Sequence, residues 1–410
     1  MGFFLTEEKV QKLVDEFNSP LYVFDKNGFI KNYFALFNSM RAIYPNYQIA
    51  YSYKTNYTPY ICKLVKDMGG YAEVVSDMEY CLAKKIGYSE DKIIYNGPAK
   101  GTKMFENMIG GGMVNIDNLQ EAYKIAEFAK ENKSQISVGI RVNIDFDDGF
   151  ISRFGVEVGS DDFNSIVSTL SDAGVEINGL HFHLSRHREL STWAKRTNLL
   201  IKIADQFLKK NLKYISLGSG MYADMETELK EQFHSVPSYE EYAQVTMQPF
   251  FEHYGKDGPI VFTEPGTTLV ARYISFISKV LSIKKIKDKT FACMDGSFEN
   301  LGEICTIKNI PVKKVLSGHG ERAVNVDLVG YTCLEQDVMR KNYDQPIAIG
   351  DVLVFGNVGG YSIVSKPPFI QPNCSMVEVC GDDFKQIMRG ETFDDVFSKF
   401  SYIEEDGEKL

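Results

Sequence analysis

The sequence predicts an α/β fold, in which a (β/α)8 barrel of the TIM type is joined to a C-terminal β-sandwich or β-barrel domain that includes the N-terminal segment. Three observations lead to this prediction. The 410 residues are too many for one ordinary core. Up to Glu264, short apolar runs alternate with helical patterns, and beyond it strands and turns predominate. The glycine-rich GxGxxG turn of an open dinucleotide-binding sheet, the next best fold, does not follow the first strand.

The expected barrel strands are short runs of apolar, β-branched or aromatic residues, at 47–53, 71–76, 92–96, 113–117, 136–143, 177–184, 213–218 and 259–264. Helical patterns follow seven of them, at 58–69, 77–87, 102–109, 119–132, 161–173, 190–210 and 238–254. In "NLQEAYKIAEFAKEN", for example, the apolar residues recur on one helical face with charges opposite. Strand–helix alternation with short loops requires a parallel sheet.

The segment "SPLYVFDK" reads as a strand outside this rhythm, and it precedes the first barrel unit. We therefore expect the barrel, residues 27–270, to be inserted between two parts of the β-rich domain, residues 1–26 and 271–410.

Composition excludes several classes of protein. The net charge is −10 with scattered basic residues, which argues against nucleic-acid binding. The sequence contains neither an apolar run of transmembrane length nor an N-terminal secretory signal, so a cytoplasmic protein without a membrane partner is expected. The seven cysteines include no CxxC pair, which indicates reduced thiols and neither a disulfide framework nor a zinc site. The acidic end, 404–410, reads as a solvated tail.

Chemistry in such a barrel lies at the carboxyl ends of the strands. Lys54 follows the first strand, where partial desolvation would make its amine a nucleophile for carbonyl groups. Taken alone, Lys54 is more simply interpreted as a side chain that extends into solvent beyond the strand. His181 and His183 alternate at the end of the sixth strand and suit ring stacking, a buried core or metal binding. No third ligand with suitable spacing is present, so no metal is predicted.

The last two strand ends add an anion site and a carboxylate. Gly218 and Gly220 in "SLGSGM" let backbone amides approach an anion closely. Glu264 follows the eighth strand and, if buried, would need a cationic partner. A nucleophilic lysine, a flat ring, a glycine turn and a carboxylate are the groups that pyridoxal 5′-phosphate (PLP) needs for its aldehyde, its ring, its phosphate and its pyridine nitrogen.

The sequence resembles the fold type III, alanine-racemase-like PLP enzymes, and within them the diaminopimelate/ornithine decarboxylase branch, from "SPLYVFD" to about residue 380. "YSYKTN" matches the YxxKxN motif, which implies that Lys54 is the Schiff-base lysine. "AEVVSDMEY" resembles D/E-V-x-S-x-x-E, which implies Glu73 near the cofactor with Ser76 and Glu79 as support. "NGPAK" and "SRFGV" match further family segments, so each short motif occurs in the expected order.

Other motifs complete the cofactor site that the resemblance implies. "HFHLS" resembles HxHxG, with His183 stacked on the cofactor ring; "LGSG" resembles the phosphate loop; "EPG" brings Glu264 to the pyridine nitrogen; "VGGYS" resembles Gly-Ala-Tyr. The implied cofactor-binding residues are Lys54, Glu73, His183, Gly218, Ser219, Gly220, Glu264, Gly266, Thr267 and Tyr361.

"GYTCLEQD" resembles the Cys-x-x-x-Asp motif and carries Cys333 and Asp337. In the family's decarboxylases this cysteine comes from the partner subunit and donates a proton, whereas racemases of the group use a tyrosine. The resemblance thus implies a lyase of amino-acid metabolism, catalytic residues Lys54 and Cys333, substrate recognition by Asp337, and a homodimer with shared active sites.

Departures from the family pattern predict an altered substrate. Thr267 replaces the arginine of EPGR, Leu334 replaces the glutamate that follows the motif cysteine, and "HLSR" brings Arg186 where HIGS is usual. Arg186 or Arg188 could supply a relocated anion contact, and Leu334 would line the substrate's far end. Carboxynorspermidine-type decarboxylation, racemisation or epimerisation on the same scaffold, and a non-catalytic partner-binding homologue remain as alternatives.

Overall fold

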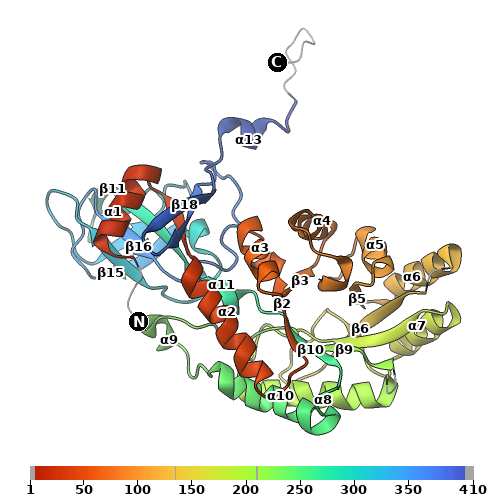
Figure 1. Cartoon of the computed structure of the whole chain (residues 1–410). Helices are drawn as coiled ribbons and strands as arrows, with labels where there is room; N and C mark the ends of the chain where they lie inside the picture. Colours follow the sequence, from red (N-terminus) through yellow and green to blue (C-terminus); the bar gives the residue numbers. More distant parts are fainter. Residues whose placement is uncertain (1–4, 134, 209–210, 402–410) are drawn as a thin grey trace. The chain divides into compact units, whose positions relative to one another are not determined.

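The computed structural model of the chain describes residues 5–133, 135–208 and 211–401, so the acidic tail lies outside the described part (Figure 1). The chain forms two compact units. The barrel unit comprises Asn32–Ala223 and His234–Thr268, and the sheet unit comprises Met1–Lys31, Asp224–Phe233 and Leu269–Leu410. The segment Asp224–Phe233 thus belongs to the sheet unit, although it falls within the range 27–270 that the sequence assigned to the barrel.

In the barrel unit, eight parallel strands of the described chain close into a ring. They are β2 (Tyr47–Ser52), β3 (Tyr71–Val74), β4 (Ile93–Tyr95), β5 (Met113–Ile116), β6 (Ser137–Asn143), β8 (Glu176–His181), β9 (Tyr214–Ser216) and β10 (Ile260–Thr263). Pairing of β2 with β10 and of β5 with β6 closes the sheet, and the short β7 (Val156–Glu157) pairs only with β6. The predicted barrel is confirmed.

The helices that alternate with these strands are α3 (Pro59–Asp67), α4 (Asp77–Ile86), α5 (Lys103–Ile109), α6 (Leu119–Asn132), α7 (Asp161–Asp172), α8 (Leu190–Phe207) and α10 (Tyr239–Tyr254), preceded by α2 (Lys26–Arg41). Several begin at a residue whose side chain accepts a hydrogen bond from the first helical turn, as Ser76 does for α4 and Ser238 for α10. Large apolar side chains such as Tyr71, Tyr214 and Phe262 fill a core cluster between the barrel strands.

The sheet unit is built on β1 (Leu21–Asp25), β11 (Ile274–Ile286), β12 (Lys289–Met294), β13 (Val312–Leu316), β14 (Val326–Val329), β15 (Val338–Tyr343), β16 (Val352–Phe355), β17 (Ser375–Cys380) and β18 (Asp383–Met388). The N-terminal strand β1 lies between β11 and β17, antiparallel to the first and parallel to the second. The prediction that the N-terminal segment joins the C-terminal domain is therefore confirmed.

Short helices complete the sheet unit: α1 (Glu7–Phe17), α9 (Thr227–Lys230), α12 (Ile304–Ile307) and α13 (Phe393–Phe397), with α11 (Thr267–Val270) at the unit boundary. Val10 and Leu13 of α1 pack on β-strand residues of the sheet core, such as Val23 and Ile277. In the described ranges no helix is long and apolar enough to cross a membrane, and no group of His, Cys, Asp or Glu side chains could hold a metal ion.

Candidate active site

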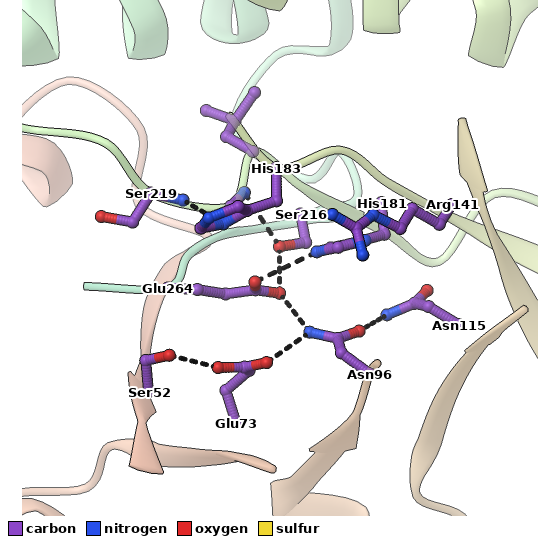
Figure 2. Close-up of polar contacts among 12 residues, drawn as sticks. Ser52, Glu73, Asn96, Asn115, Arg141, His181, His183, Ser216, Ser219 and Glu264 are labelled. Atoms are coloured by element: carbon purple, nitrogen blue, oxygen red, sulfur yellow. Dashed lines mark hydrogen bonds and ion pairs between the residues drawn. The ribbon is translucent and has the colours of Figure 1, made fainter. Parts of the chain in front are cut away.

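Every strand of the barrel contributes a polar side chain at or near its carboxyl end, and Figure 2 shows these side chains converging. These side chains, in chain order, are Ser52, Glu73, Asn96, Asn115, Arg141, His181, Ser216 and Glu264, each of which is largely buried. We call this set, together with Lys54, His183 and the glycine turn 217–221, the barrel mouth. Burying so many polar groups is unfavourable unless they are paired, and their pairing defines the site.

Lys54 lies in the single 3-10 turn Tyr53–Thr55 that directly follows β2. Its Nζ is 2.6 Å from Glu73 Oε2 and 2.7 Å from Ser52 Oγ. The Ser52 hydroxyl donates to the same Glu73 oxygen. The Glu73 side chain is 1% exposed, whereas 31% of the Lys54 side chain is exposed. The lysine amine is therefore fixed by a buried carboxylate and remains accessible.

Asn96, which follows β4, links the two buried carboxylates of the mouth. Its Nδ2 donates to Glu73 Oε1 and to Glu264 Oε1, both at 3.0 Å. Its Oδ1 accepts from Asn115 Nδ2 at 2.8 Å, and the Tyr214 hydroxyl donates to Asn115 Oδ1 at 2.8 Å. Lys54, Glu73, Asn96 and Glu264 thus belong to one continuous network.

Glu264 follows β10 and has partners on both oxygens (Figure 2). Oε1 accepts from Ser216 Oγ at 2.7 Å as well as from Asn96, and Oε2 is 3.1 Å from His181 Nε2. Burial alone would raise the pKa of Glu264, but the charge and hydrogen bond of His181, helped by Lys54, hold that pKa well below its usual range. A carboxylate has about four acceptor positions, so an ionised Glu264 can still accept a bond from a further donor.

His183 lies beyond the end of β8, and its Nδ1 accepts the amide N–H of Ser219 at 3.3 Å. Burial of the ring and the positive charge of Lys54 lower the pKa of His183 well below its usual value. The imidazole is therefore neutral at physiological pH, and the residue as a whole is half-buried. A neutral, flat ring in this position suits stacking better than ion pairing.

The turn after β9 requires glycine at two positions. Gly218 has φ +62° and Gly220 has φ +102°, and an added Cβ would lie 2.3 Å from Phe182 O and 2.1 Å from Leu184 O, respectively. In the described part of the chain, the amide N–H groups of Gly220 and Met221 have no hydrogen-bond partner. Because Met221 is only 1% exposed, its orphaned donor suits an anion.

The other cofactor and substrate candidates of the barrel unit lie in different environments. Gly266 packs so closely on Thr55 that a Cβ would lie 2.0 Å from its Oγ1, and Thr267 begins the short α11. Arg186 forms an ion pair with Asp148 at 2.9 Å, and its guanidinium lies 3.5 Å from the centroid of the Phe150 ring. The charge of Arg186 is thus already neutralised by a neighbouring loop.

Cys333, Leu334, Asp337 and Tyr361 belong to the sheet unit. Cys333 is exposed and Leu334 is half-buried, but Asp337 is only 3% exposed. Asp337 Oδ1 accepts from the Phe298 amide at 2.8 Å, and Oδ2 accepts from the Thr332 amide at 3.1 Å and its hydroxyl at 2.6 Å. The carboxylate of Asp337 therefore holds the turn that carries Cys333, and its role in substrate recognition stays a prediction.

Sequence reasoning placed Lys54, Glu73, His183, Glu264 and the glycine turn, which the structure brings to one end of the barrel. The residues that connect them, namely Ser52, Asn96, Asn115 and Ser216, were missed, as was Arg141, which pairs with Asp117. The sequence also did not indicate that His181 is the partner of Glu264. The available signal was a polar residue at the end of an apolar strand, as in "IIYN" and "MVNI".

Comparison with known proteins decides the family. Residues 32–271 match the family model described as "Pyridoxal-dependent decarboxylase, pyridoxal binding domain". The chain belongs to this family. Its cofactor is PLP, and the chain is an amino-acid decarboxylase.

Relatives match over almost the whole chain. Diaminopimelate decarboxylases of Archaeoglobus fulgidus and Aquifex aeolicus are each 25% identical to it, covering 95% of this chain and 95% and 94% of their own sequences. Among solved structures, diaminopimelate decarboxylase from M. jannaschii superposes with a TM-score of 0.82 at 22% identity, covering 95% of this chain and 93% of that one. The Helicobacter pylori enzyme complexed with L-lysine gives 0.81 at 20% identity, with 94% and 98% covered. These superpositions show a shared fold.

The barrel mouth fits the cofactor on its own chemistry. It offers an accessible amine held by a carboxylate, an ionised and buried carboxylate with room for one more donor, a neutral ring, and two orphaned amides at a glycine turn.

Proposed function

We propose that the barrel mouth binds PLP and that the chain decarboxylates an α-amino acid related to diaminopimelate but different at its far end. The observation that carries the proposal is the continuous network from Lys54 through Glu73 and Asn96 to Glu264, which holds an accessible amine and an ionised carboxylate in one frame. When bound, PLP would supply an electron sink for the bond that breaks at the α-carbon.

The residues of the barrel mouth have distinct roles in this proposal. Lys54 Nζ would hold the cofactor by condensing with its aldehyde, whose oxygen leaves as water, and Glu73 would accept the proton that the amine must lose first. Glu264, ionised by its partners, would accept a hydrogen bond from the ring nitrogen. His183 would support the ring, and the amides of Gly220 and Met221 would bind the phosphate. Gly266, Thr267 and Tyr361 are proposed as further contacts of the phosphate end.

Cys333 is the proposed proton donor to the α-carbon after CO2 leaves. We propose that it reaches the barrel mouth of a second copy, so that a homodimer contains two shared active sites. Two observations support this role: the thiol is exposed, and the turn that carries it is fixed from beneath by Asp337. A rigidly presented thiol suits proton transfer, which depends on close positioning.

The proposal of an altered substrate rests on the charged side chains that are available to bind the substrate's far end. Leu334 stands in place of the family glutamate, and Arg186 is paired with Asp148. A zwitterionic far end like that of diaminopimelate needs both a cation and an anion in the pocket, because a desolvated and unpaired charge costs binding energy. We therefore propose a substrate whose far end is less highly charged, or one that displaces Asp148 from Arg186.

The test is an assay of the full-length protein in heavy water with diaminopimelate, lysine, ornithine, arginine and carboxynorspermidine. We expect PLP-dependent CO2 release from one of them, and loss of at least about a thousandfold in rate for Lys54→Ala, because the covalent anchor is removed. The control Lys63→Ala, on the exposed surface of α3, should retain the rate. Deuterated amino acid that keeps its carboxylate would instead establish a racemase or epimerase.

A further inference from the structure

A tryptophan and an arginine of α8 lie buried behind the glycine turn. Trp193 and Arg196 are both 0% exposed, and the guanidinium carbon of Arg196 lies 3.9 Å from the centroid of the Trp193 ring. Arg196 Nη1 donates to Leu217 O at 2.9 Å and to Ser219 O at 3.0 Å, and Trp193 Nε1 donates to Gly220 O at 3.2 Å. Two side chains of one helix therefore bind three carbonyls of the turn after β9.

This set of bonds determines where the amides of the turn point. In a trans peptide unit the C=O and the following N–H point in opposite directions. Bonds from α8 to the carbonyls of Ser219 and Gly220 therefore turn the N–H groups of Gly220 and Met221 away from α8. These are the two amides that have no partner in the described part of the chain. The positive φ of Gly220 gives the backbone the freedom to adopt this arrangement.

The charge of Arg196 is the second observation. A buried guanidinium is normally paired with an acid, because an unpaired buried charge is costly. Within the described ranges no carboxylate forms an ion pair with Arg196, and its Nε has no hydrogen-bond partner. Burial lowers the pKa of Arg196 to about 9, which still leaves the group protonated at neutral pH. Carbonyl dipoles, including Leu184 O at 3.4 Å, and the face of the Trp193 ring stabilise this cation.

We propose that Trp193 and Arg196 form a carbonyl clamp, which orients the Gly220 and Met221 amides and adds a buried positive charge to bind the phosphate of the cofactor. This proposal rests on the proposed function of the barrel mouth. Both are positioning residues, since they act through the turn. The clamp also explains how the phosphate end is held without an arginine at Thr267.

The experiment compares two probes that differ only in the phosphate, pyridoxal 5′-phosphate and pyridoxal. Each is titrated into full-length protein, and binding is followed by the visible absorbance that depends on Lys54. For Arg196→Met we expect the Kd of pyridoxal 5′-phosphate to rise by about tenfold or more, the range for loss of charged hydrogen bonds, while the Kd of pyridoxal changes little. The rise in Tm on adding pyridoxal 5′-phosphate should shrink in parallel.

Matched variants separate positioning from general destabilisation. Arg196→Lys keeps a charge and donors, so it should recover part of the phosphate-dependent affinity. Thr197→Val is the control, because Thr197 is the next residue of α8, is 0% exposed, and has a hydroxyl without a partner in the described chain. It should bind both probes as the natural protein does. Trp193→Phe removes one donor and should show a smaller loss that is still confined to the phosphorylated probe.

Two results would overturn the clamp. Equal losses of both probes in Arg196→Met and Trp193→Phe would mean that these residues only support the fold. Unchanged affinities in both variants would mean that the turn holds its shape without them. If the natural protein itself shows no Lys54-dependent absorbance with either probe, the proposed function fails and the clamp fails with it. A natural protein that binds normally and variants without discrimination would reject the clamp alone.

Discussion

The barrel mouth and the Cys333 turn, residues 331–337, both bury carboxylates but use them differently. In the barrel mouth, Glu73 and Glu264 share Asn96 as a common donor, and each also has a basic partner, Lys54 or His181. In the Cys333 turn, the donors to Asp337 found among the described residues are neutral backbone and hydroxyl groups of its own unit. The first arrangement holds the pKa of Glu264 low and connects this carboxylate to the lysine amine, and the second sets the shape of a turn.

This difference implies a division of labour. A network of charged and neutral partners fixes which groups are ionised before any ligand arrives, which is the preorganisation that cofactor chemistry needs. A single buried carboxylate under an exposed thiol fixes a position only. Cofactor binding should therefore depend on the barrel mouth, and turnover should depend on both regions.

The largest effect that tests this division is expected for Cys333→Ala. Loss of the proton donor should lower kcat by about a hundredfold, the usual size of a general-acid contribution, while the Lys54-dependent absorbance stays unchanged. Cys81→Ala, an exposed cysteine on α4, is the control and should keep full activity. An equal loss of cofactor absorbance would show that cofactor binding depends on the Cys333 turn as well as on the barrel mouth.

Mixing the Lys54→Ala and Cys333→Ala proteins adds a test of the shared site. If each active site combines residues from two chains, random pairing of the two variants gives mixed dimers in about half of the molecules. Each mixed dimer has one intact site out of two, so about a quarter of full activity should return. If both residues act within one chain, mixing restores nothing.

The sequence anticipated the parts of the site that depend on local pattern. The barrel strands were identified because each apolar run is short and bounded by turns, and Lys54, Glu264 and the glycine turn follow three of those runs directly. Thus a residue at a strand end could be placed at the mouth once the barrel was inferred.

The remaining parts depend on contacts between distant segments. Asn96 and Glu264 are 168 positions apart and meet only because β4 and β10 belong to one closed barrel. The sequence cannot show that the Phe298 amide reaches the carboxylate of Asp337. It also cannot show that Arg186 pairs with Asp148, because this pairing depends on the course of an irregular loop. The substrate-binding roles of both residues stay predictions.

A smaller effect is expected in the Cys333 turn, for Asp337→Asn. An amide group cannot accept at both positions, so at least one donor of the Phe298–Thr332 set would face an N–H group. We expect the free energy of unfolding to fall by about 2–3 kcal/mol and kcat to fall with it, since Cys333 loses its fixed position. Urea unfolding and steady-state kinetics measure the two effects. Asp383→Asn, exposed on β18, should change neither; a stable Asp337→Asn protein with altered KM alone would favour direct substrate recognition.

The smallest effect is a pH dependence of the free energy of unfolding, which is caused by Glu79 at the edge of the barrel mouth. Burial, together with the negative charge of Glu73, raises the pKa of Glu79 to about 7, even though Glu79 Oε2 accepts the Val75 amide at 2.8 Å. Because this pKa is above the ordinary carboxyl value, the folded protein keeps a proton that the unfolded chain releases. The contribution of Glu79 to the free energy of unfolding is therefore greatest at low pH, and it decreases as pH rises from about 4.5 to about 7.

Glu79→Gln removes this titration while retaining an acceptor for Val75. We expect the stability of the variant relative to the natural protein to grow by about 2 kcal/mol between pH 5 and pH 8, measured by urea unfolding at intervals across that range. Glu131→Gln, an exposed carboxylate in α6, should show no such pH-dependent difference. A constant difference between the Glu79 variant and the natural protein at every pH would mean that Glu79 is ionised throughout. The environment at the edge of the barrel mouth would then not keep a proton on this carboxylate.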